Sequence, residues 1–433
     1  LSLKSYLGSS QGAPSVKGFT GVYEDSRYPG RPLRFPFKNR FDILNPKKTS
    51  SGDAIVDGDI VLSSERTSPR KFTPDPEYRW PEDPETGWPV VPYIITEESQ
   101  NDTAVILEGL AHWMEHTCLT FKETTDINQP HARFIKDDGC YSQVGRLYWQ
   151  NGQNISIGPG CEWMDTVAHE VGHCIGFEHE QCRSDRDDYV KILWENIDPE
   201  YQFAFDKLET NSTGIEYDYT SVMEYESKAF TKNGKTTMMP WNPYNEPLLS
   251  IENGLTFRDK LLANRVYGCI DKWESLCESV LQDCHEGYID YECKCVCPPG
   301  TSGDDCSKID GPYYPPLTCG GNVTEATDIQ SSNYPDGYNP NEWCMWWVQA
   351  EEGRRARVTF HDFDISERYE DGICWWDHLE IRTVDPLESG EVYCEQEISP
   401  GQEFTSEGQD LFIAFYGDEM DWYKGFSASI DFV

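Results

Sequence analysis

The sequence lacks any apolar run of the ~18 residues that a membrane-spanning helix needs. Basic residues are few, since 36 Lys and Arg stand against 76 Asp and Glu and the formal net charge is −40. So acidic a chain is repelled by phosphate backbones and anionic lipid, so we expect no nucleic-acid partner and no membrane-surface partner. Internal repeats and low-complexity tracts are also missing. The 433 residues instead suit two to four globular domains of ~150 residues each.

Cysteine is absent from residues 1–75, whereas the rest of the chain contains 16 cysteines. An even number of cysteines favours disulfides and therefore an oxidising compartment. The chain begins at Leu1 and no apolar signal core follows, so we expect that a targeting peptide has been removed. Short N-glycosylation motifs agree with this. The sequence predicts a secreted, extracellular glycoprotein, with sequons at Asn101, Asn154, Asn211 and Asn322.

Residues 1–75 differ from the rest in charge as well. They carry a net charge of +4, whereas residues 76–306 carry −25 and residues 307–433 carry −19. A basic leader on an acidic body is either a disordered tail or a pro-segment that lies on that body. The leader ends in basic residues that a trypsin-like protease can cut, at Arg66, Arg70 and Lys71.

Hydrophobic patterning predicts an α+β region from Val90 to Cys269 and an all-β region after Cys306. In the first region we expect strands at 90–96, 131–136, 145–150 and 154–158, and helices at 103–117 and 166–177. Gly176 is expected to stop the second helix. In the second region, turn signals separate alternating runs that suit a β-sandwich, at 355–360, 378–384, 410–416 and 426–432.

The string His169-Glu170-Val-Gly-His173-Cys-Ile-Gly176-Phe-Glu-His179 is the most informative motif. Two histidines four residues apart lie on one helix face and can share a metal. Gly176 lets the chain leave the helix with positive φ, so that His179 can return as a third ligand. Three neutral imidazoles leave one position for water, as in catalytic zinc sites. Glu170 is placed to take the proton of that water and pass it to the leaving amine.

The alternative is that these histidines merely lie on a surface or pack within a helix. HExxH alone occurs by chance, but the extended HExxHxxGxxH string is the metzincin pattern. Downstream, Ser221-Val-Met223-Glu224-Tyr225 supplies the methionine turn that those enzymes carry beneath the zinc. The conjunction of the two motifs favours a catalytic zinc site.

The segment GFEHEQCRSDRDDYV (176–190) closely resembles the astacin family of secreted zinc endopeptidases. The resemblance extends from the leader to Cys269. It implies an astacin-like metzincin domain, a twisted sheet with a zinc helix, in which Glu170 is general base and acid. The zinc ligands that it implies are His169, His173 and His179.

The same resemblance gives roles to three further residues. Tyr225 would be a fifth, mobile zinc ligand that swings off the metal and donates a hydrogen bond to the developing oxyanion. Glu180 would receive the mature N-terminus in a buried salt bridge. The family often has His where this chain has Glu224, which leaves the local polarity and substrate preference open.

The leader also resembles the family. Ile55-Val-Asp57-Gly58-Asp59-Ile60 is similar to the short aspartate-switch motif of astacin pro-segments. A carboxylate from Asp59 could occupy the open position on the zinc and displace the water. The alternative is an ordinary polar turn, which Asp-Gly would give in any case. Its place just before the basic cleavage sites favours the switch.

Residues 270–307 resemble an EGF-like module, and residues 319–433 resemble a CUB domain. The first is either a spacer or a binding module. In the second, Asp377 and Asp418 match calcium-ligand positions, while Ser366 stands where Glu is usual and Glu367 could replace it. A calcium site and ordinary solvated carboxylates both remain open.

The resemblances imply seven disulfides. Cys174 and Cys182 are additional to the usual set, and they either pair or remain buried thiols. Pairing is favoured, since a secreted chain rarely leaves two cysteines free. The implied disulfides are Cys118–Cys269, Cys140–Cys161, Cys277–Cys293, Cys284–Cys295, Cys297–Cys306, Cys319–Cys344 and Cys374–Cys394.

The sequence therefore predicts a secreted, zymogenic zinc endopeptidase. Its partners would be extracellular protein substrates of the matrix, cuticle, egg-envelope or growth-factor type, an activating trypsin-like protease and a protein bound by the CUB domain. The rivals are an inactive adhesion or matrix-binding protein and a different metzincin, such as an adamalysin-like or matrix protease. The expected parts are a pro-segment (1–71), a protease domain (72–269), an EGF-like module (270–307) and a CUB domain (319–433).

Overall fold

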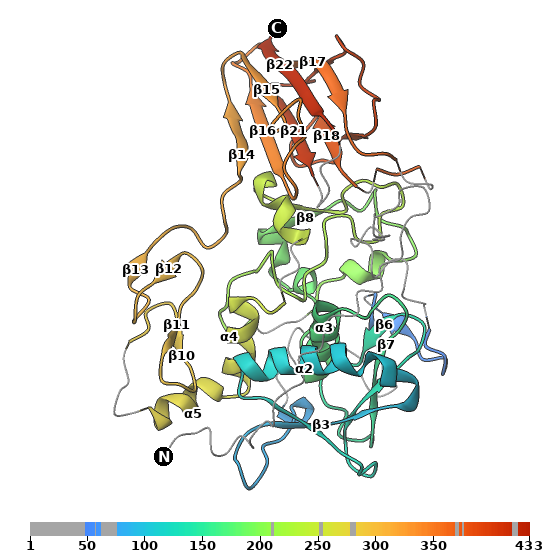
Figure 1. The fold of residues 1–433 in the computed structure, drawn as a ribbon, viewed down its shortest axis with the longest axis vertical. Coiled ribbons are helices and arrows are strands. Elements are labelled where there is room, and N and C mark those ends of the chain that lie inside the picture. The colour runs from blue at the N-terminus through green and yellow to red at the C-terminus, as the bar shows by residue number, and fades with distance from the viewer. Residues whose placement is uncertain are drawn as a thin grey trace. The chain divides into compact units, whose positions relative to one another are not determined.

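The computed structural model describes residues 48–56, 58–61, 76–208, 212–250, 254–277, 283–368, 372–374, 376–417 and 423–433. A seven-stranded mixed sheet forms the first region (Figure 1). Its members are β1 (Ile55–Val56), β2 (Ile60–Val61), β3 (Val90–Ile95), β4 (Thr120–Glu123), β5 (Ala132–Ile135), β6 (Cys140–Ser142) and β7 (Gln153–Ile157). The spatial order is β1-β2-β6-β7-β5-β3-β4. The strands expected near 90–96, 131–136 and 154–158 are confirmed.

Part of the leader belongs to this sheet. β1 and β2 form an antiparallel pair, and β2 runs parallel to β6 with Ile60 opposite Ser142. The N–H of Ser142 also donates to the carbonyl of Asp59 at 2.9 Å. The backbone before β2 is thereby fixed at the end of β6.

Helices α2 (Thr103–His116) and α3 (Met164–Ile175) confirm the two helices expected from the sequence. They approach closely at Gly109, where a Cβ atom would lie only 2.5 Å from Cγ1 of Val167. The indole N–H of Trp113 donates to the carbonyl of Ala168 at 2.9 Å and ties the two helices together. Gly176 ends α3 with φ of +113°, a left-handed conformation that glycine adopts without strain.

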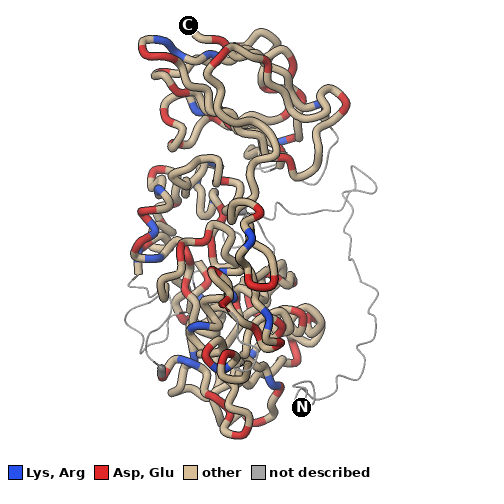
Figure 2. The backbone as a smooth tube through the Cα atoms, turned by 90° about the vertical axis from the view of Figure 1, so that its left-hand side faces the viewer, with Lys and Arg blue, Asp and Glu red and all other residues tan. Residues whose placement is uncertain are grey.

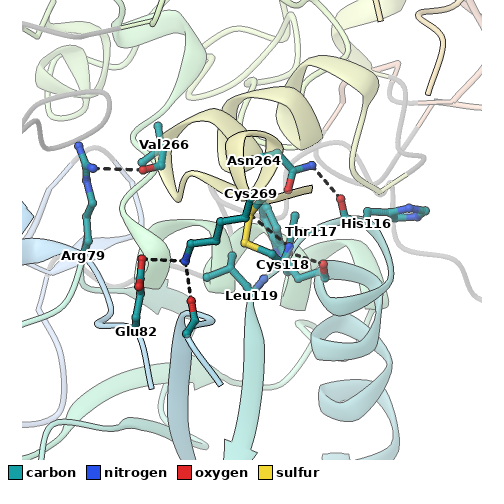
Figure 3. Close-up of a disulfide and its surroundings, with 12 residues drawn as sticks. Arg79, Glu82, His116, Thr117, Cys118, Leu119, Asn264, Val266 and Cys269 are labelled. Carbon is teal, nitrogen blue, oxygen red and sulfur yellow. Dashed lines mark hydrogen bonds and ion pairs between the residues drawn. A yellow bond between two sulfur atoms is a disulfide. The ribbon is translucent and has the colours of Figure 1, made fainter. Parts of the chain in front are cut away.

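A disulfide closes the other end of this region (Figure 3). Cys118, just before β4, bonds to Cys269, the first residue of α5 (Cys269–Leu276), across a sequence separation of 151. The N–H of Cys118 donates to Sγ of Cys269, and the amide of Asn264 in α4 (Phe257–Val266) donates to the carbonyl of His116. α4 and α5 are thereby attached to the end of α2.

The expectation of a strand at 145–150 is wrong, because this segment is a series of bends and turns. Gly145 has φ of +70°, which breaks an extended conformation. The side chain of Gln153 accepts from Leu147 N–H and donates to Gly145 O, in place of a strand partner. Tyr148 stacks edge-to-face on Tyr78 at 5.8 Å between ring centroids. The apolar run therefore builds an aromatic loop.

The C-terminal region has little helix. Two short hairpins, β10 (Tyr288–Ile289) with β11 (Cys295–Val296) and β12 (Thr301–Ser302) with β13 (Lys308–Ile309), follow α5. A sandwich of two sheets comes next, ordered β14-β16-β21-β18-β19 and β15-β22-β17-β20. Its strands are β14 (Cys319–Val323), β15 (Thr327–Gln330), β16 (Trp343–Gln349), β17 (Ala356–Asp364), β18 (His378–Arg382), β19 (Glu391–Tyr393), β20 (Glu403–Thr405), β21 (Asp410–Tyr416) and β22 (Gly425–Phe432). The four expected sandwich strands are confirmed.

All seven implied disulfides are present, with the pairing given above. The favoured pairing of Cys174 with Cys182 is wrong, since both are buried cysteines that form no disulfide. The two sulfurs have different neighbours: Sγ of Cys174 accepts from Gln153 at 3.6 Å, and Sγ of Cys182 donates to the carbonyl of Ala204 at 3.5 Å. Burial raises the pKa of Cys174 to about 12, so its thiol stays protonated and unreactive.

Acidic residues are spread along the described chain, in the helix-and-strand region as well as in the sandwich (Figure 2). None of the helices in the described part of the chain is long and apolar enough to cross a membrane.

Candidate metal centre

Three histidines converge at the end of α3. His169 and His173 lie one turn apart on this helix, and the turn at Gly176 brings His179 back to them. Their side chains are buried, and Nε2 of His173 lies 3.1 Å from Nε2 of His169. Ligand atoms of the three histidines and of Asp59 all lie within 4.8 Å of one another.

The tautomers of these rings follow from their hydrogen bonds. Nδ1 of His169 lies 2.6 Å from the carbonyl of Val222, and Nδ1 of His173 lies 2.8 Å from the carbonyl of Phe177. A carbonyl only accepts, so each Nδ1 bears the proton and each Nε2 presents a lone pair to the centre. Burial lowers the pKa of His179 to about 4, which also favours a neutral ring. Converging lone pairs repel one another unless a cation lies between them, so this donor set fits Zn²⁺.

Asp59 faces the three rings from the leader. One carboxylate oxygen lies 2.9 Å from Nε2 of His169, and the other lies 3.1 Å from Nε2 of His179 and 3.4 Å from Nε2 of His173. The side chain of Asp59 is completely buried among these rings. The carboxylate adds the negative charge that a divalent cation prefers among its ligands.

Gly58 makes this approach possible. It has φ of +83°, and a Cβ atom there would lie 2.8 Å from both Cζ of Phe230 and the hydroxyl oxygen of Tyr225. Only a residue without a side chain passes between these two rings. Asp57 lies outside the described residues.

Glu170 lies in α3 beside the first histidine and is completely buried. Neither of its carboxylate oxygens has a hydrogen-bond partner among the described residues. Burial, and after it the negative charge of Asp59, raise the pKa of Glu170 well above its usual value. A carboxyl group in this state can hold a proton at neutral pH and is suited to proton transfer.

The methionine turn lies directly under α3. Sδ of Met223 packs so closely on Gly172 that a Cβ there would lie 2.7 Å from the sulfur. The carbonyl of Met223 accepts from the N–H of Glu180 at 2.9 Å. The turn therefore supports both the helix that carries two histidines and the loop that carries the third.

Tyr225 lies beside the histidines with its ring fully buried. Its ring centroid is 4.6 Å from that of His179, and Phe205 and Phe230 pack around it at 5.8 Å and 5.5 Å. Glu224 is also buried, and one of its oxygens accepts from the N–H of Tyr225 at 3.1 Å. A carboxyl group thus lies at the position where the family often has His.

Glu180 is bound inside the protein. It accepts from Nη1 of Arg183 at 2.7 Å and from the N–H of Asp218 at 3.0 Å. Arg183, only 1% exposed, also donates to Asp185 from Nε and Nη2. Arg183 is not among the residues that the sequence predicts for this site, although the charge-rich RSDRDD string after the zinc motif is a signal that could reveal it.

No cluster with metal-ligand spacing among the described residues contains the expected calcium ligands Asp377 or Glu367. Asp377 is buried and accepts from the hydroxyl of Tyr338 at 2.5 Å, and Ser366 is also buried. Glu367 is exposed, and Asp418 lies outside the described residues. Among the described residues, the clusters in the sandwich with metal-ligand spacing each contain a disulfide pair, Cys319 with Cys344 or Cys374 with Cys394.

Comparison with known proteins gives two family matches. The model of the Astacin peptidase family matches residues 76–268, and the CUB domain model matches residues 319–430. The sandwich described above lies within the second match, apart from the last residues of β22.

The chain also resembles whole proteins. It is 31% identical over 408 residues to Protein SpAN of Strongylocentrotus purpuratus, a match that covers 89% of this chain and 64% of that protein. It is 30% identical over 419 residues to Zinc metalloproteinase dpy-31 of Caenorhabditis elegans, which covers 90% of this chain and 68% of that protein. The chain therefore spans less than two thirds of the length of SpAN and about two thirds of that of dpy-31.

Among solved structures, the chain is similar to High choriolytic enzyme 1, a hatching enzyme zinc-protease from Oryzias latipes. The sequence identity is 35% and the TM-score is 0.42, over 45% of this chain and 96% of that chain. From the dpy-31 match and the family model, the chain belongs to the astacin peptidase family of zinc metalloproteases.

Proposed function

We propose that this protein is a secreted zinc endopeptidase of extracellular proteins, made as a zymogen that Asp59 keeps inactive. The observation that carries the proposal is the buried centre itself. Three imidazole nitrogens converge there, a carboxylate from the leader faces them, and Glu170 lies alongside without a hydrogen bond to any described residue. A structural zinc site has no use for such a carboxylic acid.

The residues divide the reaction between them. His169, His173 and His179 would hold Zn²⁺, which supplies Lewis-acid polarisation of the scissile carbonyl and lowers the pKa of a water molecule. Glu170, which lies beside the first histidine, takes a proton from the attacking water and gives it to the leaving amine. Tyr225 donates a hydrogen bond from its hydroxyl to the oxyanion as negative charge develops.

Latency follows from the place of the leader. Asp59 occupies the side of the histidines that a substrate carbonyl must reach, and β2 pairs with the end of β6. Cleavage by a trypsin-like protease near Arg66, Arg70 or Lys71, which lie outside the described residues, would release the segment. The new N-terminus would then bind Glu180, which here binds Arg183.

The C-terminal parts suit an extracellular protease. We propose that residues 270–307 form an EGF-like module, a proposal that the three disulfides of the 277–306 segment support. The CUB domain would bind a protein partner, and a calcium ion at Asp377 and Asp418 would stabilise it. The name of High choriolytic enzyme 1 describes a hatching enzyme. For this chain we propose extracellular protein substrates of the egg-envelope, cuticle, matrix or growth-factor type.

The rival, an inactive binding protein with the same fold, would need a missing ligand or a missing Glu170. This chain has all of them. Measurable peptide turnover would exclude the inactive binding protein. If no turnover were found, that alternative would stand.

The experiment compares the intact chain, the trypsin-processed chain and the Asp59→Ala variant on a peptide library. We expect little turnover from the intact chain and full turnover after processing. Asp59→Ala should raise the activity of the uncleaved chain at least about tenfold, which corresponds to ~1.4 kcal/mol less stable closure. The matched control is Asp53→Ala, since Asp53 lies in the same segment but is exposed and should remain latent. An intact wild type as active as the processed enzyme would refute the switch.

A further inference from the structure

Tyr314 lies in the connection between β13 and β14, outside the region that matches the protease family. Its hydroxyl nevertheless contacts four groups of the protease region. It accepts from Nη1 of Arg258 at 2.8 Å and from the N–H of Tyr219 at 3.2 Å. Its own proton lies within reach of Oδ1 of Asp218 at 3.2 Å and of the carbonyl of Tyr217 at 3.3 Å. One hydroxyl of the linker therefore joins it to the protease region through four hydrogen-bond contacts.

The neighbouring ring adds to this attachment. The guanidinium of Arg258 lies 4.0 Å from the ring centroid of Tyr313, a distance typical of a cation–π contact. The hydroxyl of Tyr313, by contrast, is buried and has no hydrogen-bond partner among the described residues. Both rings lie near Arg258, at 4.0 Å for Tyr313 and 5.7 Å for Tyr314, but only the hydroxyl of Tyr314 has hydrogen-bond partners among the described residues.

From Tyr314 a continuous series of hydrogen bonds leads inward. Oδ2 of Asp218 accepts from the hydroxyl of Thr256 at 2.8 Å, and this threonine caps α4. In the same capping box, Oδ2 of Asp259 accepts from the N–H of Thr256 at 3.0 Å. Asp218 and Asp259 are both buried, so these bonds are shielded from water.

The series ends on a metal ligand. Asp259 accepts from the hydroxyl of Ser221 at 2.6 Å and from the N–H of Val222 at 3.0 Å. The carbonyl of Val222 in turn accepts from Nδ1 of His169 at 2.6 Å. The position and tautomer of this ligand therefore depend on the methionine turn, and the turn depends on Asp259.

We propose that Tyr314 is a positioning residue of the metal centre, which acts through Asp218, Asp259 and the methionine turn on His169. The inference rests on the proposed zinc protease function and adds to it. The linker to the CUB domain thus contributes to the metal centre: the enzyme needs the hydroxyl of Tyr314 for tight metal binding and full turnover.

The test compares Tyr314→Phe with Tyr313→Phe in the full-length chain and in its processed form. Both changes remove one hydroxyl from adjacent rings, and both keep the ring contacts with Arg258. Loss of a direct partner of a ligand typically costs about 10- to 100-fold in metal affinity or activity. Since Tyr314 lies several bonds away, we expect Tyr314→Phe to speed zinc loss to a chelator about 3- to 10-fold. It should lower kcat by a similar factor, with KM unchanged, while Tyr313→Phe behaves as wild type.

Two results would overturn the proposal. One is equal zinc release and equal kcat in the two variants. The other is a fall in kcat that merely follows the folded fraction, measured by thermal unfolding, with zinc release unchanged. A wild type that holds zinc but cleaves no peptide would refute the protease function alone, because the chelator measurement still compares the two tyrosines.

Discussion

Glu170 and Glu180 are buried carboxylates on either side of the end of α3, and their surroundings are opposite. Glu180 accepts from the guanidinium of Arg183 at 2.7 Å and from the N–H of Asp218 at 3.0 Å. Glu170 has no hydrogen bond to a described residue, and burial together with the charge of Asp59 raises its pKa. A fixed cation neutralises the carboxylate of Glu180, whereas Glu170 has no hydrogen-bonded cation among the described residues and its pKa is raised.

The largest effect should come from Glu170→Gln. Because the amide cannot take a proton from water, we expect kcat of the processed enzyme to fall by ~10²–10⁴. Zinc content and thermal stability should stay near the wild-type values, because Glu170 is neither a ligand in this arrangement nor part of an ion pair. Turnover within tenfold of wild type would show that Glu170 does not transfer the proton. Its surroundings would then differ from those of Glu180 without a consequence for catalysis.

The counterpart change is Arg183→Met, which leaves Glu180 buried without its cation. Breaking one half of a buried ion pair typically costs ~3–5 kcal/mol, so the free energy of unfolding in urea should fall by about that amount. The double variant Glu180→Gln/Arg183→Met is the control and should recover part of the loss. A loss below about 1 kcal/mol for the single change would mean that water reaches the pair.

The third change displaces Asp59, the carboxylate whose charge helps to raise the pKa of Glu170. In Gly58→Ala the new Cβ meets Phe230 and Tyr225 at 2.8 Å, so Asp59 should be pushed away from the histidines. We expect a cost of ~1–3 kcal/mol to the closed state and a roughly 5- to 100-fold rise in the activity of the intact chain. Gly52→Ala is the matched control, because Gly52 has φ of +90° but no atom within 4 Å of a Cβ. Equal activity of the two variants would assign the effect to backbone strain alone.

The sequence predicts the residues of this site that lie close together in the chain better than the contacts between residues far apart in it. His169, His173 and the stop at Gly176 follow from helix periodicity and from the freedom of glycine, which are local properties. The partners of Glu180 and of the methionine turn could not be read in this way. Arg183 neutralises Glu180 only because the chain folds back after His179, and Asp259 reaches Val222 from a separate helix. The prediction of a strand at 145–150 was wrong for a related reason: the side chain of Gln153 binds this segment where a neighbouring strand would pair with it.

The smallest effect concerns Asp259, a third buried carboxylate, which is bonded to neutral donors and lies near a second acid. Burial, and then the charge of Asp218, raise the pKa of Asp259 from its usual value to about 6. The folded state therefore binds this proton more tightly than the unfolded state. The contribution of Asp259 to stability falls as the pH rises from its usual pKa toward about 6. Between about pH 5 and pH 7 the loss should be about 1 kcal/mol in the free energy of unfolding. Asp259→Asn also weakens hydrogen bonds to Ser221 and Val222, but that cost is the same at both pH values.

The measurement is therefore the free energy of unfolding in urea of wild type and variant at these two pH values. Contributions common to both proteins cancel in the difference between them. We expect wild type to lose about 1 kcal/mol more than the variant over this range, and an equal loss would show that Asp259 is already ionised at the lower pH.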